Sequence, residues 1–275
     1  MLPPFRAHVD VWVILGSVVA AYLIAGKRHA ERTGQPVSPH ARRLFLGGML
    51  ALWVGADWPI HDWAEHYLYS MHMVQHMLFT LIAAPLLVAG IPAWLWRDLL
   101  RNPRVRRLWR FVTRPLVAIV IFYTTLLFSH WPAVVTFSTH SEPGHFALHC
   151  TLVLSAMIMW WPVVSPLPEM PPITPPAQML YLFFVSLAPT VPAAFLTFGR
   201  VPLYPVYATF PRIWGISALT DEMIAGLTMK IGGTLILWTV IATIFFRWAR
   251  REQNEGWDAL QWRDVDAELR AGIDR

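Results

Sequence analysis

Charged side chains are scarce in this chain. Only 14% of its 275 residues are Asp, Glu, Lys or Arg, whereas 56% are hydrophobic; an average soluble protein has about 25% charged residues. This composition excludes an ordinary water-soluble domain and predicts a membrane protein. The formal net charge of +5 comes from local arginine clusters, so it indicates topology in the bilayer, and we expect no nucleic acid partner.

Cysteine is almost absent as well. The one cysteine, Cys150, excludes a disulfide within the chain and any CxxC motif. A thiol-based metal or redox site is therefore not expected. Tryptophan and proline are abundant instead, with 15 and 23 residues. Both suit a helical membrane protein, because aromatic residues line membrane interfaces and proline is tolerated in spanning helices.

Seven stretches are apolar and close to the ~20 residues that a helix needs to cross a bilayer. They cover residues 10–26, 41–57, 71–91, 113–131, 145–162, 178–198 and 222–246. The predicted fold is therefore all-α, a polytopic membrane protein with a seven-transmembrane helix bundle. We predict two parts, a transmembrane domain over residues 1–248 and a charged cytoplasmic tail over residues 249–275.

Lysine and arginine favour alternate connections between these stretches. They cluster after the first, third and seventh stretches and are missing from the connections after the second and fourth. By the positive-inside rule, the N-terminus lies outside and the C-terminus in the cytoplasm. Lys27 and Arg28 follow the first apolar run, whereas a secretory signal carries its positive charge in front. We therefore expect this run to stay as an anchor in the lipid bilayer of the inner (plasma) membrane.

Histidines concentrate at the predicted outer side. His72 and His76, in MHMVQHMLFT, open the third stretch, and His145 and His149, in HFALHC, open the fifth. A spacing of four puts both imidazoles of a pair on one helical face, from where both can reach one metal ion. His130, in SHWP, closes the fourth stretch at a similar depth. These five residues predict a metal or cofactor site, in preference to histidines that only join helices by hydrogen bonds.

Other polar residues are candidates for additional ligands or for contacts around the ligands. Asp57 ends the second stretch, and Asp221 and Glu222 open the seventh, where acids also suit the helix dipole. Lys230 lies inside the seventh stretch and needs a partner in the bundle, for which Glu222 and Asp57 are the candidates. The segment DWPIHDWAEH, which contains His61 and His66, is interpreted as a solvated loop.

The expected metal is copper. Imidazole suits copper, zinc, iron and nickel, and thioether ligands select Cu(I). Met73 and its neighbours Met71 and Met77 alternate with the first histidine pair, although methionine in an apolar helix is more often plain packing. The sequence therefore favours Cu(I), with zinc as the second choice.

The segment MHMVQHMLFTLIAAPLLVAGIP resembles the signature of the caa3-type cytochrome c oxidase assembly factor family, the CtaG proteins of the Gram-positive type. The segments SHWP, HFALHC and LYPVYATFPRIWGISALTDEMIAGLTMK resemble further blocks of that family in the same order. The resemblance implies a seven-span protein that matures a haem–copper oxidase, with a cytochrome c oxidase subunit as client and copper as cargo. It carries over to His72, His76, His130, His145, His149 and Asp221. Glu222 and Lys230 depart from the family pattern, in which glutamine and tryptophan are usual.

Three functions stay in competition. The first is a non-enzymatic assembly factor that holds Cu(I) near the outer leaflet and passes it to an oxidase subunit. The second is a zinc-dependent intramembrane hydrolase with three histidine ligands, a water, and Asp57, Asp221 or Glu222 as base. The third is a haem-binding membrane cytochrome with axial histidines from two helices. Bound zinc would favour the second, and a red preparation the third.

Overall fold

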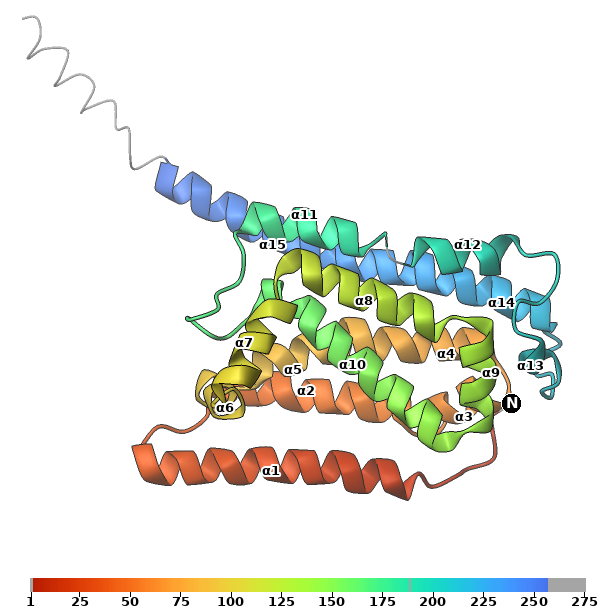
Figure 1. The fold of residues 1–275 in the computed structure, drawn as a ribbon, viewed down its shortest axis with the longest axis horizontal. Coiled ribbons are helices and arrows are strands. Elements are labelled where there is room, and N and C mark those ends of the chain that lie inside the picture. Colours follow the sequence, from red (N-terminus) through yellow and green to blue (C-terminus); the bar gives the residue numbers. More distant parts are fainter. Residues whose placement is uncertain (1, 188, 257–275) are drawn as a thin grey trace, which may run out of the picture.

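The regular structure of the chain is helical. The computed structural model describes residues 2–187 and 189–256, and every regular element within these residues is a helix. Figure 1 shows long helices running side by side, with α1 (Val9–Thr33) along one edge, α2 (Pro39–Ala56) next to it and α15 (Gly233–Gly256) towards the opposite edge. The predicted all-α class is confirmed.

Several long helices change their winding or break along their length. In chain order, these segments are α4 (Tyr69–Met77), η1 (Leu78–Ala83) and α5 (Ala84–Gly90), then α11 (Pro175–Val185) and α12 (Thr190–Phe198), and finally α14 (Ala218–Leu227) and η2 (Thr228–Gly232), which continues into α15. The two η segments are π-helical. Such insertions are frequent at functional sites, and η1 begins two residues after His76.

Seven further helices complete the bundle in the described part of the chain. They are α3 (Ile60–His66), α6 (Ala93–Leu99), α7 (Pro103–Val112), α8 (Pro115–Ser129), α9 (Pro132–His140), α10 (Glu142–Val164) and α13 (Pro205–Ala208). Many helices of the molecule begin with proline, among them α2, α7, α8, α9 and α11. Proline suits this position, because its φ is already helical and the first N–H has no partner within the helix. Several of the many prolines therefore lie at the starts of helices.

The candidate membrane spans are fewer than the seven apolar stretches. Five helical segments are long and apolar enough to cross a membrane, and a sixth candidate joins α7 and α8 across an 80° bend. The five begin at Val9, Tyr69, Glu142, Pro175 and Ala218. The helix at the predicted stretch 41–57, α2, is not among them, and its first turns carry His40, Arg42 and Arg43. Five or six spans are therefore supported, and a count of seven stays a prediction.

The main apolar core lies where α10 meets η1, α8 and α11. Trp160 is 1% exposed there, and its Nε1 donates to the carbonyl oxygen of Thr80 at 2.8 Å. The backbones of α2 and α5 approach each other very closely at Gly90. A Cβ added to this glycine would lie 2.3 Å from the backbone nitrogen of Phe45. Only glycine fits such a crossing, and small residues at helix contacts are the usual means of packing in a bilayer.

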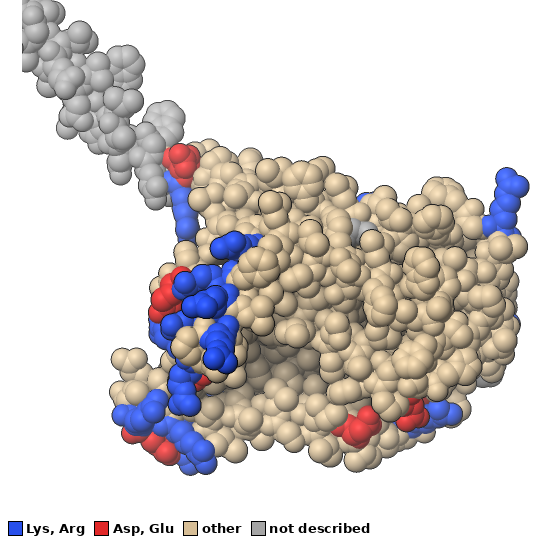
Figure 2. Space-filling view, in the orientation of Figure 1, with Lys and Arg blue, Asp and Glu red and all other residues tan. Residues whose placement is uncertain are grey.

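Basic side chains gather at one end of the molecule. Figure 2 shows most of the visible Lys and Arg at the end where α1 finishes and α7 lies, whereas Figure 1 places α3, α9 and α13 at the opposite end. This distribution favours the predicted orientation with α3 outside, which stays a prediction. α15 runs through the predicted boundary at residue 248, and residues 257–275 of the predicted tail lie outside the described residues.

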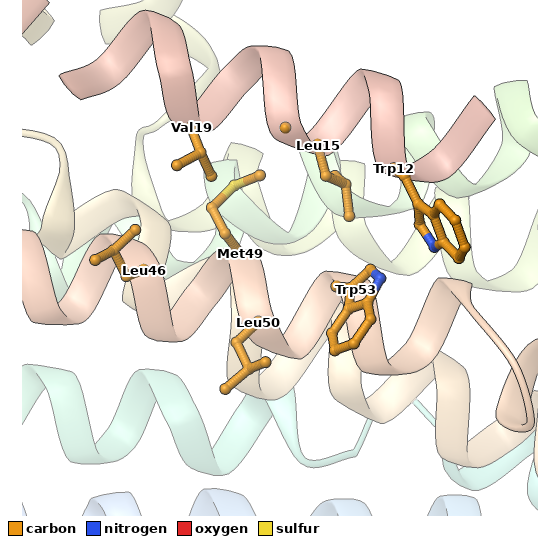
Figure 3. A pocket seen from close by; sticks show the side chains of 8 residues that line it. Trp12, Leu15, Val19, Leu46, Met49, Leu50 and Trp53 are labelled. Atoms are coloured by element: carbon orange, nitrogen blue, oxygen red, sulfur yellow. The ribbon is translucent and has the colours of Figure 1, made fainter. Parts of the chain in front are cut away.

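A cavity of about 340 Å³ lies between α1 and α2. Figure 3 shows side chains of both helices pointing into it. Its lining consists of Trp12, Leu15, Gly16, Val19, Leu46, Met49, Leu50 and Trp53. Because none of these side chains is ionisable, this cavity suits hydrocarbon and does not form a chemical site.

Candidate metal centre

Three imidazoles from two helices converge where α4 and α10 begin. His72 and His76 lie one turn apart on α4, and His149 lies near the start of α10. One nitrogen from each of the three rings lies within 4.8 Å of the other two. His76 is buried, and His72 and His149 are half-buried. Neutral imidazoles that converge in this way form a donor set suited to one transition-metal ion.

His145 extends this cluster by another imidazole. Its side chain is buried one turn before His149, and its Nε2 lies 3.1 Å from Nε2 of His149. Its Nδ1 contacts Oε1 of Glu65 on α3. A carboxylate accepts hydrogen bonds, so Nδ1 of His145 carries the proton and its Nε2 is left with a lone pair that faces His149. In this tautomer, Nε2 of His145 is available as a fourth ligand.

His130 lies beside the cluster at the end of α8. Its ring centre is 5.4 Å from that of His76, and its Nδ1 lies 2.8 Å from the carbonyl oxygen of Leu126. Since a carbonyl only accepts, Nδ1 carries the proton and Nε2 keeps its lone pair. That Nε2 is buried and has no hydrogen-bond partner within residues 2–187 and 189–256. The five predicted histidines therefore form one connected group.

Glu65 holds a second imidazole with its other oxygen. Nε2 of His61 lies 3.2 Å from Oε2 of Glu65. On the other side of this ring, Nε2 of Gln75 lies 3.1 Å from Nδ1 of His61. The same amide nitrogen donates to the carbonyl of Gly55. Burial raises the pKa of Glu65, but hydrogen bonds from His145 and His61 outweigh it and hold this pKa well below its usual range. Burial lowers the pKa of His61, while Glu65, together with the charges of Asp62 and Asp10, raises it by more. The carboxylate is thus ionised and bridges two rings.

Asp221, far away in the sequence, fixes the start of α4. Leu68 precedes this helix and offers no capping side chain. The carboxylate of Asp221 accepts from the backbone nitrogen of Tyr69 at 2.6 Å and from the backbone nitrogen and hydroxyl of Ser70 at 3.1 and 2.5 Å. It thereby satisfies free N–H groups and complements the helix dipole. Asp221 positions the helix that carries the first histidine pair.

Glu222 fixes the segment behind His130. Its carboxylate accepts from the backbone nitrogens of Leu203 and Tyr204 at 2.6 and 2.8 Å. The hydroxyl of Tyr204 donates to the carbonyl of His130 at 2.8 Å. Burial is the main cause that raises the pKa of Tyr204 to about 12, so this hydroxyl stays a donor. The adjacent residues Asp221 and Glu222 on α14 therefore hold two different segments beside the cluster, the start of α4 and the segment that contains Tyr204.

The other predicted ligands are not brought to the cluster. The Asp57 carboxylate accepts from Nε1 of Trp12 at 2.6 Å. Met73 is 1% exposed and packs in an apolar group with Tyr69 and Met229. Asp221 and Glu222 use their oxygens for backbone donors, as described above. These four side chains support the fold around the site and do not form it.

The predicted pairing of Lys230 with an acid is wrong. Its ammonium donates to the hydroxyl of Thr190 at 2.7 Å and to the carbonyl of Ser186 at 3.3 Å. Ser186 ends α11, where the helix leaves carbonyl groups without partners. Lys230 therefore bridges the break between α11 and α12, with neutral oxygens in place of a carboxylate.

Sequence reasoning missed Glu65, His61 and Gln75. The segment interpreted as a solvated loop forms the short helix α3. Asp62 on this helix is 2% exposed, and its Oδ2 lies 3.0 Å from Nε2 of His8. His61 and Glu65 are four residues apart, the same spacing that singles out the histidine pairs. Applied to acids as well as histidines, that spacing would have found them.

A cavity of about 220 Å³ leads to the cluster from the α3 and α9 end. Its lining includes Glu65, His66, His72, Ser138, Thr139, His140, Ser141, Glu142, His145 and Tyr207. Two of the clustered histidines, His72 and His145, thus face a polar cavity that carries two carboxylates. Such a lining attracts cations.

These features define the chain as a polytopic helical membrane protein with a candidate metal centre at one end of the bundle. A sequence profile described as cytochrome c oxidase caa3 assembly factor (Caa3_CtaG) matches residues 20–251. The match covers most of the chain and all five clustered histidines, so the chain belongs to this family and has a role in cytochrome oxidase assembly. The resemblance seen in the sequence is confirmed. Searches of curated proteins and of solved structures gave no match.

Proposed function

We propose that this protein is a non-enzymatic assembly factor that binds Cu(I) at the histidine cluster and passes it to a subunit of cytochrome c oxidase. Family membership supports the client. The observation that carries the copper proposal is the convergence of nitrogens from His72, His76 and His149 within 4.8 Å. Ionisable side chains inside spanning helices are costly and usually mark function, and here five imidazoles share one place.

The buried donors fit a metal ion. Nδ1 of His76 and Nε2 of His130 are buried without a hydrogen-bond partner in the described part of the chain. A buried polar atom in that condition costs free energy unless a ligand satisfies it. With Nε2 of His145 held towards His149, the cluster offers three to five neutral nitrogen donors.

The surroundings of the cluster favour transport over hydrolysis. A hydrolytic zinc site needs an open position for water and a nearby general base. The predicted bases Asp57, Asp221 and Glu222 all accept hydrogen bonds elsewhere. Glu65 is occupied by two imidazoles. A Cu(I) site requires only the soft or nitrogen donors that are present, and a bis-histidine haem would use just two of the five rings.

The cavity lined by His72 and His145 supplies a route for the ion. It lies at the end of the bundle opposite the basic cluster. The positive-inside rule assigns the basic cluster to the cytoplasmic side, so the cavity opens at the outer face of the plasma membrane. We propose that the client docks over this opening and takes the ion from these two histidines, which face it.

The test is the metal content of the oxidase made in cells. A strain lacking the protein is complemented with wild type, with His72→Ala/His76→Ala, or with the control His40→Ala, whose side chain is exposed on α2. The double variant should yield oxidase with a lowered ratio of copper to haem, whereas the control should match wild type. Oxidase with normal copper content, made beside a double variant present at wild-type level in the membrane, would overturn the proposal.

A further inference from the structure

Helix α7 lies outside the bundle that holds the metal centre. None of its residues is buried, and it meets α8 at an 80° bend. The first turns of α8 carry highly exposed apolar side chains, with Leu116 79% and Val120 61% exposed. These surfaces suit a helix that crosses lipid, so the bend lays α7 along the membrane surface.

The sequence of α7 separates charge from apolar surface. At 100° per residue, Arg104, Arg106, Arg107 and Arg110 fall on one side. Val105, Leu108, Trp109 and Val112 fall on the opposite side, in the i, i+3, i+4, i+7 pattern of an amphipathic helix. Leu108 is 61% exposed and Val105 is 45% exposed, so this apolar surface is only partly covered by the protein.

The position of α7 is fixed by packing and capping. Trp109 contacts Trp96 and Trp161, with ring centres 5.5 and 5.2 Å apart. The side chain of Asn102 caps the helix by accepting from the backbone nitrogen of Arg104 at 2.9 Å. The arginines are therefore presented on a defined surface at the basic end of the molecule, which Figure 2 shows.

These arginines are short of counter-charges. All four are exposed, and none forms an ion pair with another residue of the described chain. The neighbouring Arg97 does have a partner, since it binds Glu169 at 2.8 Å. Four like charges within about two turns repel one another, so a negatively charged ligand on this face would be bound favourably.

We infer that α7 is a binding surface for the headgroups of anionic phospholipids. Guanidinium groups bind phosphate oxygens in bidentate fashion, and the exposed side chains of Val105 and Leu108 would enter the acyl region on the opposite side of the helix. The combination of charge with exposed apolar side chains favours a bilayer over an acidic protein segment, because only two residues separate α7 from α8, whose first turns carry the exposed apolar side chains of Leu116 and Val120. This surface is distinct from the metal centre and independent of its cargo.

The test is lipid retention by the full-length protein purified in mild detergent. The protein is equilibrated with equal amounts of phosphatidylglycerol and phosphatidylcholine, and bound lipid is measured by native mass spectrometry. Wild type should prefer phosphatidylglycerol. A variant with Arg104→Gln, Arg106→Gln, Arg107→Gln and Arg110→Gln should bind it at least about tenfold more weakly, given the contribution of each basic residue at an anionic surface.

Two matched variants make the outcome decisive. Arg247→Gln/Arg250→Gln/Arg251→Gln removes charge from the end of α15 and should keep wild-type retention. Changing the four α7 arginines to lysine should keep most of the preference. If the glutamine variant of α7 retains phosphatidylglycerol as wild type does, the inference is wrong. If that variant instead loses oxidase assembly in cells with unchanged lipid retention, α7 binds a protein partner and not lipid.

Discussion

The carboxylate of Glu65 and Nδ1 of His145 form a hydrogen bond that joins α3 to α10. This contact leaves Nε2 of His145 facing His149 at 3.1 Å. Carboxylates that hold metal-binding histidines in this way fix the ring tautomer and raise the basicity of the other nitrogen. The cluster thus has a supporting contact as well as candidate ligands.

Glu65→Gln should weaken Cu(I) binding without abolishing it. The amide is neutral and can offer only one acceptor oxygen where the carboxylate serves both His61 and His145. Loss of such a supporting contact typically reduces metal affinity about 10–100-fold. The affinity is measured by competition with a coloured Cu(I) chelator. Glu142→Gln is the control, because Glu142 lines the same cavity but is exposed. Equal affinities for both variants would contradict the role of Glu65.

The stability of the metal-free protein should depend on pH through His61 and Glu65. The folded pKa of Glu65 is lowered from 4.5, so its contribution is present above pH 4.5 and is lost as pH falls through the folded value. The folded pKa of His61 is raised from 6.5, so its contribution is complete below pH 6.5 and is lost as pH rises through the folded value. The pair therefore stabilises most between these two ordinary values.

Thermal unfolding of His61→Gln checks this dependence. The advantage of wild type over the variant should be larger at about pH 6 than at about pH 8.5, because the contribution of protonated His61 is lost as pH rises through its raised pKa. In a Glu65→Gln background, the same substitution should show a smaller change with pH, because only the charges of Asp62 and Asp10 then raise the pKa of His61. An advantage that is constant or grows with pH would rule out the ion pair.

Asp221→Ala should destabilise the fold. Asp221 is fully buried, and its removal leaves two backbone N–H groups and a hydroxyl at the start of α4 without their acceptor. Unsatisfied buried groups cost about 1–3 kcal/mol each, so we expect a loss of about 3–5 kcal/mol in the free energy of unfolding. The melting temperature in detergent measures it. Asp221→Asn, which keeps one acceptor oxygen, should lose about half as much; an unchanged melting temperature in the alanine variant would contradict the capping role.

Local patterns were sufficient to predict the helices and the histidines. Each of the seven apolar stretches contains a helix, because long apolar runs need internal hydrogen bonding in a bilayer. The spacing of His72 with His76 and of His145 with His149 identified side chains on one face. The pairing of these helices with each other followed only from their similar depth.

Contacts between distant segments could not be predicted. Asp221 looked like a residue of its own helix start, yet it caps α4. Lys230 was expected to need an acid, yet a helix break supplies two neutral oxygens. In both cases the partner is decided by which helices lie side by side, and that information is absent from the local sequence pattern.

Binding of Cu(I) by the histidine cluster is tested most directly by metal retention in the purified protein. Wild type, His72→Ala/His76→Ala and the control His40→Ala are incubated with Cu(I) or with Zn(II) under reducing conditions, washed, and analysed by mass spectrometry for bound metal. Wild type and the control should retain Cu(I) tightly and in preference to zinc, and the double variant should lose it. Retention of Cu(I) by the double variant at the wild-type level, or no retention by wild type, would contradict Cu(I) binding at the histidine cluster.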